Sequence, residues 1–294
     1  MADFYTPYEE RTPDSQYRDR VKFVLEHGSL EPTPQGVPAL TCFGNVPAME
    51  FDLSNGAPVI PDRSMMRFWK KALIEIIAFA NGVRDVNELI TLGCDYWKDY
   101  LGKGEKYGLA PDDLGPGSYG AAFHDFPMPD GRGFNQYEAV IQQIRARPEL
   151  RTHFISPWIP FYAFRGPEKK VVVATCHGWQ QYRVIQGKLH LLMWQRSADL
   201  PIGVPSNMAQ YAAMLLLMAR ATGLPPGTYI HQFGDAHIYE TQVEKMRELI
   251  AREPKRLPTL TLSPDAEDFF SVTADDFELT DYDPHPGMKV AYHP

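Results

Sequence analysis

Cys176 and Arg196 are the two residues whose types and spacing point most directly to chemistry. Cys176 lies in the run ATCHGWQQYRV, and Arg196 follows twenty residues later in WQRSADLPIGVPSNMAQYA. A thiolate is a nucleophile, and a nearby guanidinium both lowers the thiol pKa and binds phosphate oxygens through a planar fork. The simpler alternatives are a small buried hydrophobe for Cys176 and a surface ion pair for Arg196. A nucleophile beside a phosphate clamp would indicate nucleotide chemistry.

Four further residues extend this set. Asn207 begins an apolar helical stretch, so it is either a helix N-cap or an amide whose donor and acceptor match N3-H and O4 of uracil. His237 and Tyr239 are two residues apart and would share one face of a strand, where they could bind a ribose hydroxyl or simply fill the core. Glu75 lies in an apolar helical run, where burial would raise its pKa and suit it to proton transfer.

Hydrophobic periodicity predicts the elements that position these side chains. Strands and helices are segregated along the chain, which predicts a mixed α+β fold. We expect one domain over residues 1–294, with 1–16 as a flexible N-terminal extension. The run 171–176 is predicted to be a strand that ends at Cys176, beside the strand of Arg196. The expected helices are 17–27, 65–80, 136–147, 207–222 and 237–252; the expected strands are 171–176, 180–185, 189–195, 227–234, 257–262 and 277–279; residues 39–53 should form a hairpin and 102–134 a functional or poorly ordered loop.

Composition narrows the class of protein. The 294 residues are 44% hydrophobic, enough for a substantial core. A net charge of -8, with no run of lysines or arginines, argues against a nucleic-acid partner. No apolar stretch reaches the roughly 18 residues of a membrane span, and the polar, acidic N-terminus is unlike a secretory signal. Three cysteines without a CxxC pair argue against a disulfide framework or a structural zinc site, so we expect a cytoplasmic protein without a metal.

Beyond single residues, the sequence resembles the thymidylate synthase family, in the family's order and spacing across nearly the whole chain. The resemblance implies the thymidylate synthase fold: a mixed β-sheet packed with helices, with one sheet face forming the interface of an obligate homodimer. The matching stretches are LGPGSYG at 114–120, Arg151 with SPW, CHGWQQY, WQRSADLPIGVPSNMAQYA, GDAHIYETQ, AREPKRLP and YDPHPGMK.

The resemblance also implies the chemistry. The Cys176 thiolate would add to C6 of deoxyuridine 5'-monophosphate (dUMP), and C5 would then attack the methylene carbon of methylenetetrahydrofolate. Arg151 would reach the phosphate site of the partner subunit. By resemblance, the catalytic residues are Cys176, Glu75, Tyr119, His177 and Asn207; the nucleotide is bound by Arg151, Gln181, Arg196, Ser197, Asn207, His237 and Tyr239; the folate is bound by Trp97, Asp199 and Gly203.

The sequence departs from the family at four places. Pro34 or Gln35 stands where the family has a phosphate-binding arginine, and Thr152 replaces the second of two arginines that cross to the partner subunit. Ser206 replaces a folate-side phenylalanine, and the chain ends KVAYHP where the family has an aliphatic residue that seals the site.

Excluding water from the site favours hydride transfer, which gives thymidylate, over addition of water. The polar Ser206 and the altered tail are better suited to admitting water, so these changes predict 5-hydroxymethyl-dUMP as the product. Viral hydroxymethylases that serve phage DNA modification make such products. Thymidylate with dihydrofolate is the alternative product. A non-catalytic nucleotide-binding homologue is a further alternative, which the presence of Cys176, Glu75 and Asn207 disfavours.

Overall fold

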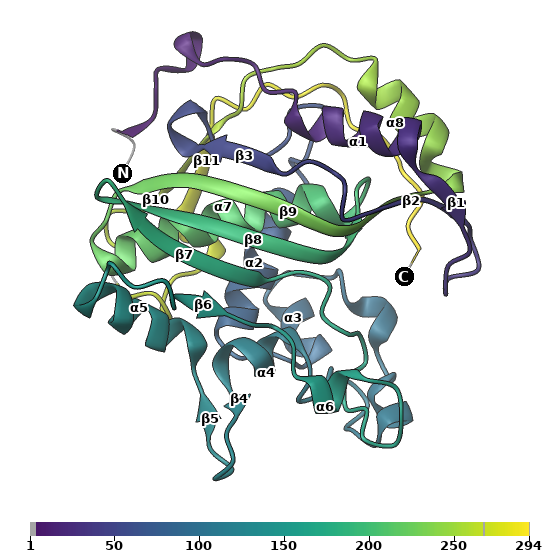
Figure 1. Cartoon of the computed structure of the whole chain (residues 1–294), viewed down its shortest axis with the longest axis vertical. Coiled ribbons are helices and arrows are strands. Elements are labelled where there is room, and N and C mark those ends of the chain that lie inside the picture. Colours follow the sequence, from purple (N-terminus) through teal and green to yellow (C-terminus); the bar gives the residue numbers. More distant parts are fainter. Residues whose placement is uncertain (1–3, 267, 294) are drawn as a thin grey trace.

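The computed structural model describes residues 4–266 and 268–293 and is a mixed α+β structure (Figure 1). Within these residues a seven-stranded sheet has the order β1-β2-β9-β8-β7-β6, and β3 also pairs with β9. The helices are α1 (Gln16–His27), α2 (Trp69–Ala80), α3 (Val86–Thr91), α4 (Tyr119–His124), α5 (Gln136–Ala146), α6 (Pro160–Ala163), α7 (Gly203–Thr222) and α8 (Val243–Ile250). The strands are β1 (Ser29–Glu31), β2 (Ala39–Phe43), β3 (Met49–Asp52), β4 (Phe126–Pro127), β5 (Gly133–Phe134), β6 (Phe154–Ile155), β7 (Trp179–Ile185), β8 (Lys188–Asp199), β9 (Pro226–Tyr239), β10 (Thr259–Leu262) and β11 (Phe277–Thr280).

The two long strands β8 and β9 form the centre of the sheet and run parallel, whereas the other pairs in it are antiparallel. Side chains along β8 alternate between buried and partly exposed positions, as expected for a strand with one face on the core. Behind that face lies α7, whose residues are almost all buried. A helix that is apolar all round belongs inside a protein, and α2 packs against α7 to complete this core.

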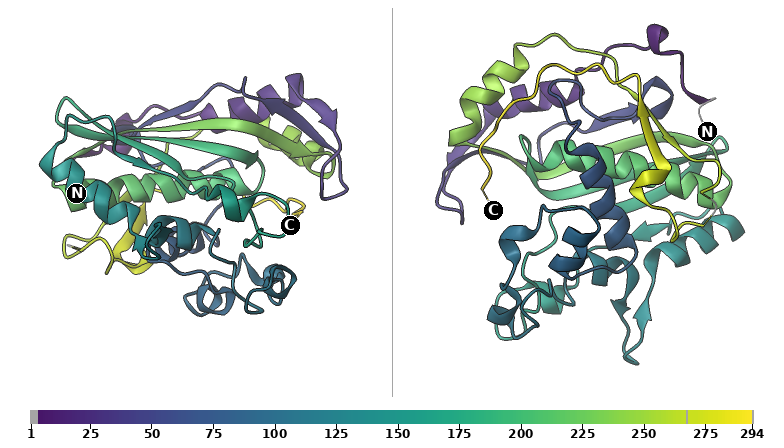
Figure 2. Two further views of the ribbon diagram at one scale, coloured as in Figure 1. Left: turned by 60° about the horizontal axis from the view of Figure 1, so that its bottom comes forward. Right: turned by 180° about the vertical axis from the view of Figure 1, so that it is seen from behind.

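The helices α2, α4, α5 and α7 gather on one side of the sheet, and the opposite side over β6, β7 and β8 carries no helix of the described chain (Figure 2). Apolar side chains lie on this open face: Phe154 is 48% exposed, and the rings of Trp179 and Trp194 are 5.1 Å apart. A sheet face of this kind is a candidate interface for a second copy.

Four predicted elements are wrong. Residues 102–134 are not one loop, because they include α4, β4 and β5. Residues 39–53 do not form a hairpin, because β2 and β3 each pair with β9 instead of with one another. The apolar run 171–176 is irregular rather than a strand. The predicted helix 237–252 begins only at Val243, because β9 continues through Gly234 to Tyr239 along its parallel partner β8.

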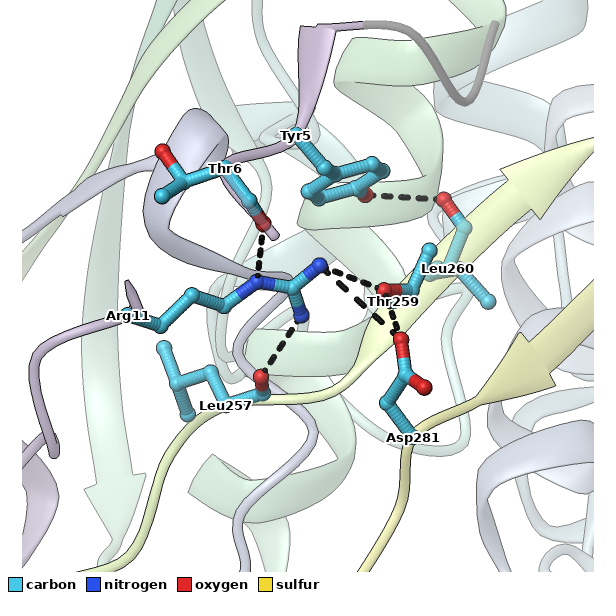
Figure 3. Close-up of polar contacts among 7 residues, drawn as sticks. All are labelled: Tyr5, Thr6, Arg11, Leu257, Thr259, Leu260 and Asp281. Atoms are coloured by element: carbon cyan, nitrogen blue, oxygen red, sulfur yellow. Dashed lines mark hydrogen bonds and ion pairs between the residues drawn. The ribbon is translucent and has the colours of Figure 1, made fainter. Parts of the chain in front are cut away.

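The N-terminal segment is bound to the molecule where the sequence predicts a flexible extension; residues 1–3 of that extension lie outside the described residues. Arg11 is buried, and its guanidinium donates to the carbonyls of Thr6 and Leu257 at 2.9 and 3.0 Å and to Thr259 Oγ1 at 2.6 Å (Figure 3). Asp281 lies 4.0 Å from the same guanidinium. A buried cation satisfied in this way fixes the segment to β10 and to the residue after β11.

Candidate active site

The structure brings Cys176 and Arg196 together. Arg196 Nη2 lies 3.6 Å from Cys176 Sγ, and Arg196 Nε donates to the carbonyl of Thr175 at 3.0 Å. The guanidinium also lies over the Trp158 ring, 5.6 Å from its centroid. Burial raises the pKa of the Cys176 thiol, and the Arg196 charge acts in the opposite direction. A thiol beside a fixed cation is the arrangement that favours a thiolate nucleophile.

Tyr119 and Ser197 tie the segment of Cys176 to its surroundings. The backbone N-H of Cys176 donates to Tyr119 Oη at 2.6 Å, and Ser197 N donates to the Cys176 carbonyl at 3.1 Å. Tyr119 begins α4, and its ring stacks on His177 at 4.6 Å. These bonds hold the irregular run before β7, so Cys176 is positioned by tertiary contacts rather than by a strand.

His177 is a buried, neutral imidazole. Its Nδ1 lies 2.7 Å from Tyr211 Oη, and burial lowers its pKa to about 3. The next residue, Gly178, has φ of 101°, and a Cβ there would come within 2.8 Å of Tyr211 Oη. Glycine is therefore required by both the backbone conformation and the close approach of Tyr211.

Asn207 belongs to a buried chain of side-chain amides. It lies in the second turn of α7, which begins at Gly203, so it is not an N-cap. Asn207 Nδ2 donates to Gln210 Oε1 at 2.9 Å, and Asn207 Oδ1 accepts from Gln195 Nε2 at 3.0 Å. Gln195 Oε1 in turn lies 2.8 Å from His231 Nε2. The network fixes which end of the Asn207 amide donates and which accepts.

Glu75 ends this network on α2. Its carboxylate accepts from Trp97 Nε1 and from Gln210 Nε2, each at 2.5 Å. Burial raises the Glu75 pKa to about 7, against the effect of these two hydrogen bonds. Glu75 also contributes to the raised pKa of Tyr119, after burial and Cys176, so the two groups interact. A carboxyl group that titrates near neutral pH is suited to proton transfer.

Asp199 and Tyr239 lie at the ends of the paired strands β8 and β9. Burial raises the Asp199 pKa, and the nearby His237 lowers it; Asp199 Oδ1 accepts from Ile202 N at 3.2 Å. His237 Nδ1 lies 2.7 Å from Asp235 Oδ1, and its ring is 5.4 Å from that of Tyr239. The predicted pair His237 and Tyr239 therefore stays on one strand, beside Asp199.

The C-terminal segment returns to this region. The carbonyl of Ala291 accepts from Gln242 Nε2 at 2.8 Å, and His293 Nε2 lies 2.7 Å from Thr241 Oγ1. The His293 ring is 4.6 Å from that of Tyr239. The Tyr292 pKa is raised, mainly by burial and to a smaller extent by the neighbouring Tyr100. Pro294, the last residue of the predicted altered tail, lies outside the described residues.

Two predicted nucleotide ligands, Arg151 and Gln181, are hydrogen-bonded to one another. The Arg151 side chain is exposed, and its carbonyl accepts from Gln181 Nε2 at 3.1 Å. Gln181 is on β7, two residues after Trp179, which belongs to the open sheet face. An exposed arginine at this edge is available to a second copy of the chain, whereas nothing within the described chain brings it to Arg196.

A comparison with protein families identifies the chain. A family model described as thymidylate synthase matches residues 15–293, which span all the site residues above. The chain belongs to the thymidylate synthase family. The assignment confirms the resemblance and the fold, and it supports one-carbon transfer to dUMP with methylenetetrahydrofolate as co-substrate.

Sequence reasoning missed three residues that build this candidate site: Gln195, Gln210 and Tyr211. Each is buried and hydrogen-bonded to a predicted site residue or to its immediate partner. Gln210 had a local signal, since it is a polar residue one turn after Asn207 in an otherwise apolar helix. Within the described residues no helix is long and apolar enough to cross a bilayer, and no group of three or more His, Cys, Asp or Glu side chains is arranged to hold a metal.

Proposed function

We propose that this chain is a deoxyuridylate hydroxymethylase, with Cys176 as the covalent nucleophile and 5-hydroxymethyl-dUMP as the product. Arg196 supports both parts of the nucleotide site: its Nη2 faces the Cys176 sulfur, and the remaining N-H groups of its fork are suited to phosphate oxygens. Ser197, joined to Cys176 through the backbone, adds a hydroxyl to this clamp. The thiolate adds to C6 of the pyrimidine, and Glu75 and Tyr119 serve the proton transfers.

Asn207 supports uracil as the preferred base. Its amide uses one donor on Gln210 and one acceptor position on Gln195, which leaves a second N-H and a second lone pair. These complement O4 and N3-H of uracil. Cytosine presents an amine and an unprotonated N3, which reverse both partners, so dCMP is the poorer substrate.

Trp97 and Asp199 fit a reduced pterin. Asp199 is a buried carboxylate whose Oδ1 accepts from a backbone N-H, and a carboxylate has further lone pairs for a ligand N-H. The Trp97 indole is fixed by Glu75 and lies 5.3 Å from the Tyr100 ring, which gives an apolar surface for a planar ligand. Gly203 begins α7, four residues after Asp199 in the sequence. When bound here, methylenetetrahydrofolate supplies the one-carbon unit.

The polar residues of the C-terminal segment are the main support for 5-hydroxymethyl-dUMP as the product. The residues that return to Tyr239 and Tyr100 are Tyr292 and His293, which offer a hydroxyl and an imidazole in place of an aliphatic seal. Ser206 adds a second polar group near Tyr96, whose hydroxyl donates to the Phe68 carbonyl at 3.0 Å. Polar groups at these two places hold a water near the reacting carbon more readily than aliphatic and phenyl groups.

Thymidylate is the second candidate product, and the same tail supplies its support. The bonds from Gln242 to Ala291 and between Thr241 and His293 hold the tail against the sheet, and a tail held in this way also excludes bulk water. The product therefore depends on which effect is larger at the reacting carbon.

A homodimer formed through the open sheet face completes the proposed site. The exposed Arg151 would reach the phosphate of the neighbouring copy, where it supplements Arg196. This contribution matters because Pro34 or Gln35 replaces the family's other phosphate-binding arginine, and Thr152 replaces a second one.

Mass spectrometry of the nucleotide product tests the proposal. Purified protein, dUMP and methylenetetrahydrofolate should give 5-hydroxymethyl-dUMP, with little dihydrofolate absorbance. The matched variant Ser206→Phe should shift the product ratio toward thymidylate, because the phenyl group displaces water. Thymidylate from the wild type, formed in step with dihydrofolate, would refute the hydroxymethylase and leave Cys176 as the nucleophile of a thymidylate synthase.

A further inference from the structure

A basic pocket lies outside the site described above, and one of the two segments that line it follows α6, which Figure 1 labels. It is a cavity of about 590 Å³ between two segments, 106–108 and 165–170. Its lining carries four cationic side chains, those of Lys106, Arg165, Lys169 and Lys170, around Tyr107. None of the lining residues is acidic, although the whole chain has a net charge of -8.

The lysines are positioned by neutral groups of Tyr107. Lys169 Nζ lies 4.5 Å from the centroid of the Tyr107 ring and donates to its hydroxyl at 3.3 Å, and Lys170 Nζ donates to the Tyr107 carbonyl at 3.0 Å. Lys106 Nζ is 5.9 Å from the same ring. These contacts orient the ammonium groups without neutralising them.

No ion pair between described residues includes any of the four cations of this pocket. Glu105 precedes Lys106 in the sequence and Glu168 precedes Lys169, but neither glutamate lines the cavity. Like charges gathered around one cavity repel each other, and an anion with several charges removes that repulsion. The pocket is therefore electrostatically complementary to a polyanion.

We propose that this basic pocket binds a small polyphosphate, either free or as the tail of a nucleoside triphosphate. Four cations exceed what one orthophosphate requires, so two or more linked phosphates are the matching charge. The concave shape and the restriction of the cations to one cavity favour a small ligand over a nucleic-acid strand, which needs a longer basic surface. Arg196, the phosphate ligand of the catalytic site, is not among the lining residues.

Calorimetric titration of the full-length protein with tripolyphosphate tests the proposal, in the presence of saturating dUMP so that the Arg196 clamp is filled. We expect one site per chain, binding that weakens as salt is added, and at least about tenfold weaker binding of orthophosphate. The double variant Lys169→Gln and Lys170→Gln should weaken tripolyphosphate binding by about tenfold or more, since two charge-assisted contacts are lost.

The matched control is Lys98→Gln with Lys103→Gln, which removes the same charge from exposed positions outside the pocket. This control should bind tripolyphosphate as the wild type does, and all proteins should keep the same melting temperature. A parallel titration with ATP distinguishes the sources: tighter binding of ATP than of tripolyphosphate assigns the site to nucleotides, and equal binding assigns it to the polyphosphate alone. No binding, equal weakening in both double variants, or tighter binding of a single-stranded oligonucleotide would overturn the proposal.

Discussion

Glu75→Gln is expected to change how the stability of the protein depends on pH. Burial raises the Glu75 pKa from 4.5 to about 7, so the folded state holds its proton at pH values where the unfolded state has lost it. Below the unfolded pKa the group is protonated in both states and costs nothing. As pH rises through the folded pKa, the wild type loses stability, and glutamine at this position does not.

The size of the effect follows from the two pKa values. Their difference of about 2.5 pH units corresponds to about 3 kcal/mol of unfolding free energy, lost by the wild type between about pH 4.5 and 7. The amide of the substituted glutamine would accept from only one of Trp97 and Gln210 and present its own N-H to the other, a pH-independent cost of about 1–3 kcal/mol. The variant should therefore be less stable than the wild type at pH 5, and equally or more stable at pH 8.

Urea unfolding of both proteins from pH 5 to 8.5 measures this difference. Glu31→Gln, at an exposed glutamate, is the matched control and should track the wild type at every pH. A stability difference between Glu75→Gln and the wild type that stays constant across the range would refute a raised Glu75 pKa. The same variant should also lose most turnover, since it cannot transfer a proton.

Two further predictions concern base choice and the N-terminal segment. Asn207→Asp should lower turnover of dUMP and allow some with dCMP, because a carboxylate accepts from the cytosine amine; steady-state rates check this, and unchanged dUMP preference would contradict it. Arg11→Met should lower the unfolding free energy by at least about 2 kcal/mol, because buried carbonyls lose their donor, whereas the exposed control Arg132→Met should change it little; equal urea midpoints would contradict the role of Arg11.

The predictable parts of the fold are those with local signals. The turn Gln186-Gly187 has positive φ at both residues, as a tight hairpin requires, so the β7–β8 pair could be anticipated. The helix α7 followed from its apolar run. The segment 171–176 was wrongly predicted to be a strand. An apolar run can also form an irregular core segment when side chains such as Tyr119 accept hydrogen bonds from its backbone N-H groups. Strand β9 continues beyond Gly234, the predicted end, because β8 pairs with it up to His237. No local sequence pattern reveals this pairing.

The candidate site likewise has residues that could be predicted from the sequence and residues that could not. Family spacing placed Cys176 and Arg196 in one site, and the structure brings them within contact. Gln210 could have been suspected as a polar residue in an apolar helix, but its bond to Glu75 on α2 has no local signal. Gln195 could not be chosen from the other glutamines, because its importance lies in a hydrogen bond between β8 and α7. Arg11 had no local signature either, since three of its partners, Leu257, Thr259 and Asp281, lie near the other end of the chain.

Trapping of the covalent nucleotide adduct tests the central claim most directly. Intact-mass spectrometry after incubation with 5-fluoro-dUMP and methylenetetrahydrofolate should show one nucleotide and one folate added to the chain. Cys176→Ser should give no adduct, and Cys42→Ala, at a buried cysteine of the core, should still give it. A wild-type protein that binds the nucleotide without an adduct, or an adduct that persists in Cys176→Ser, would contradict the assignment of Cys176 as the nucleophile.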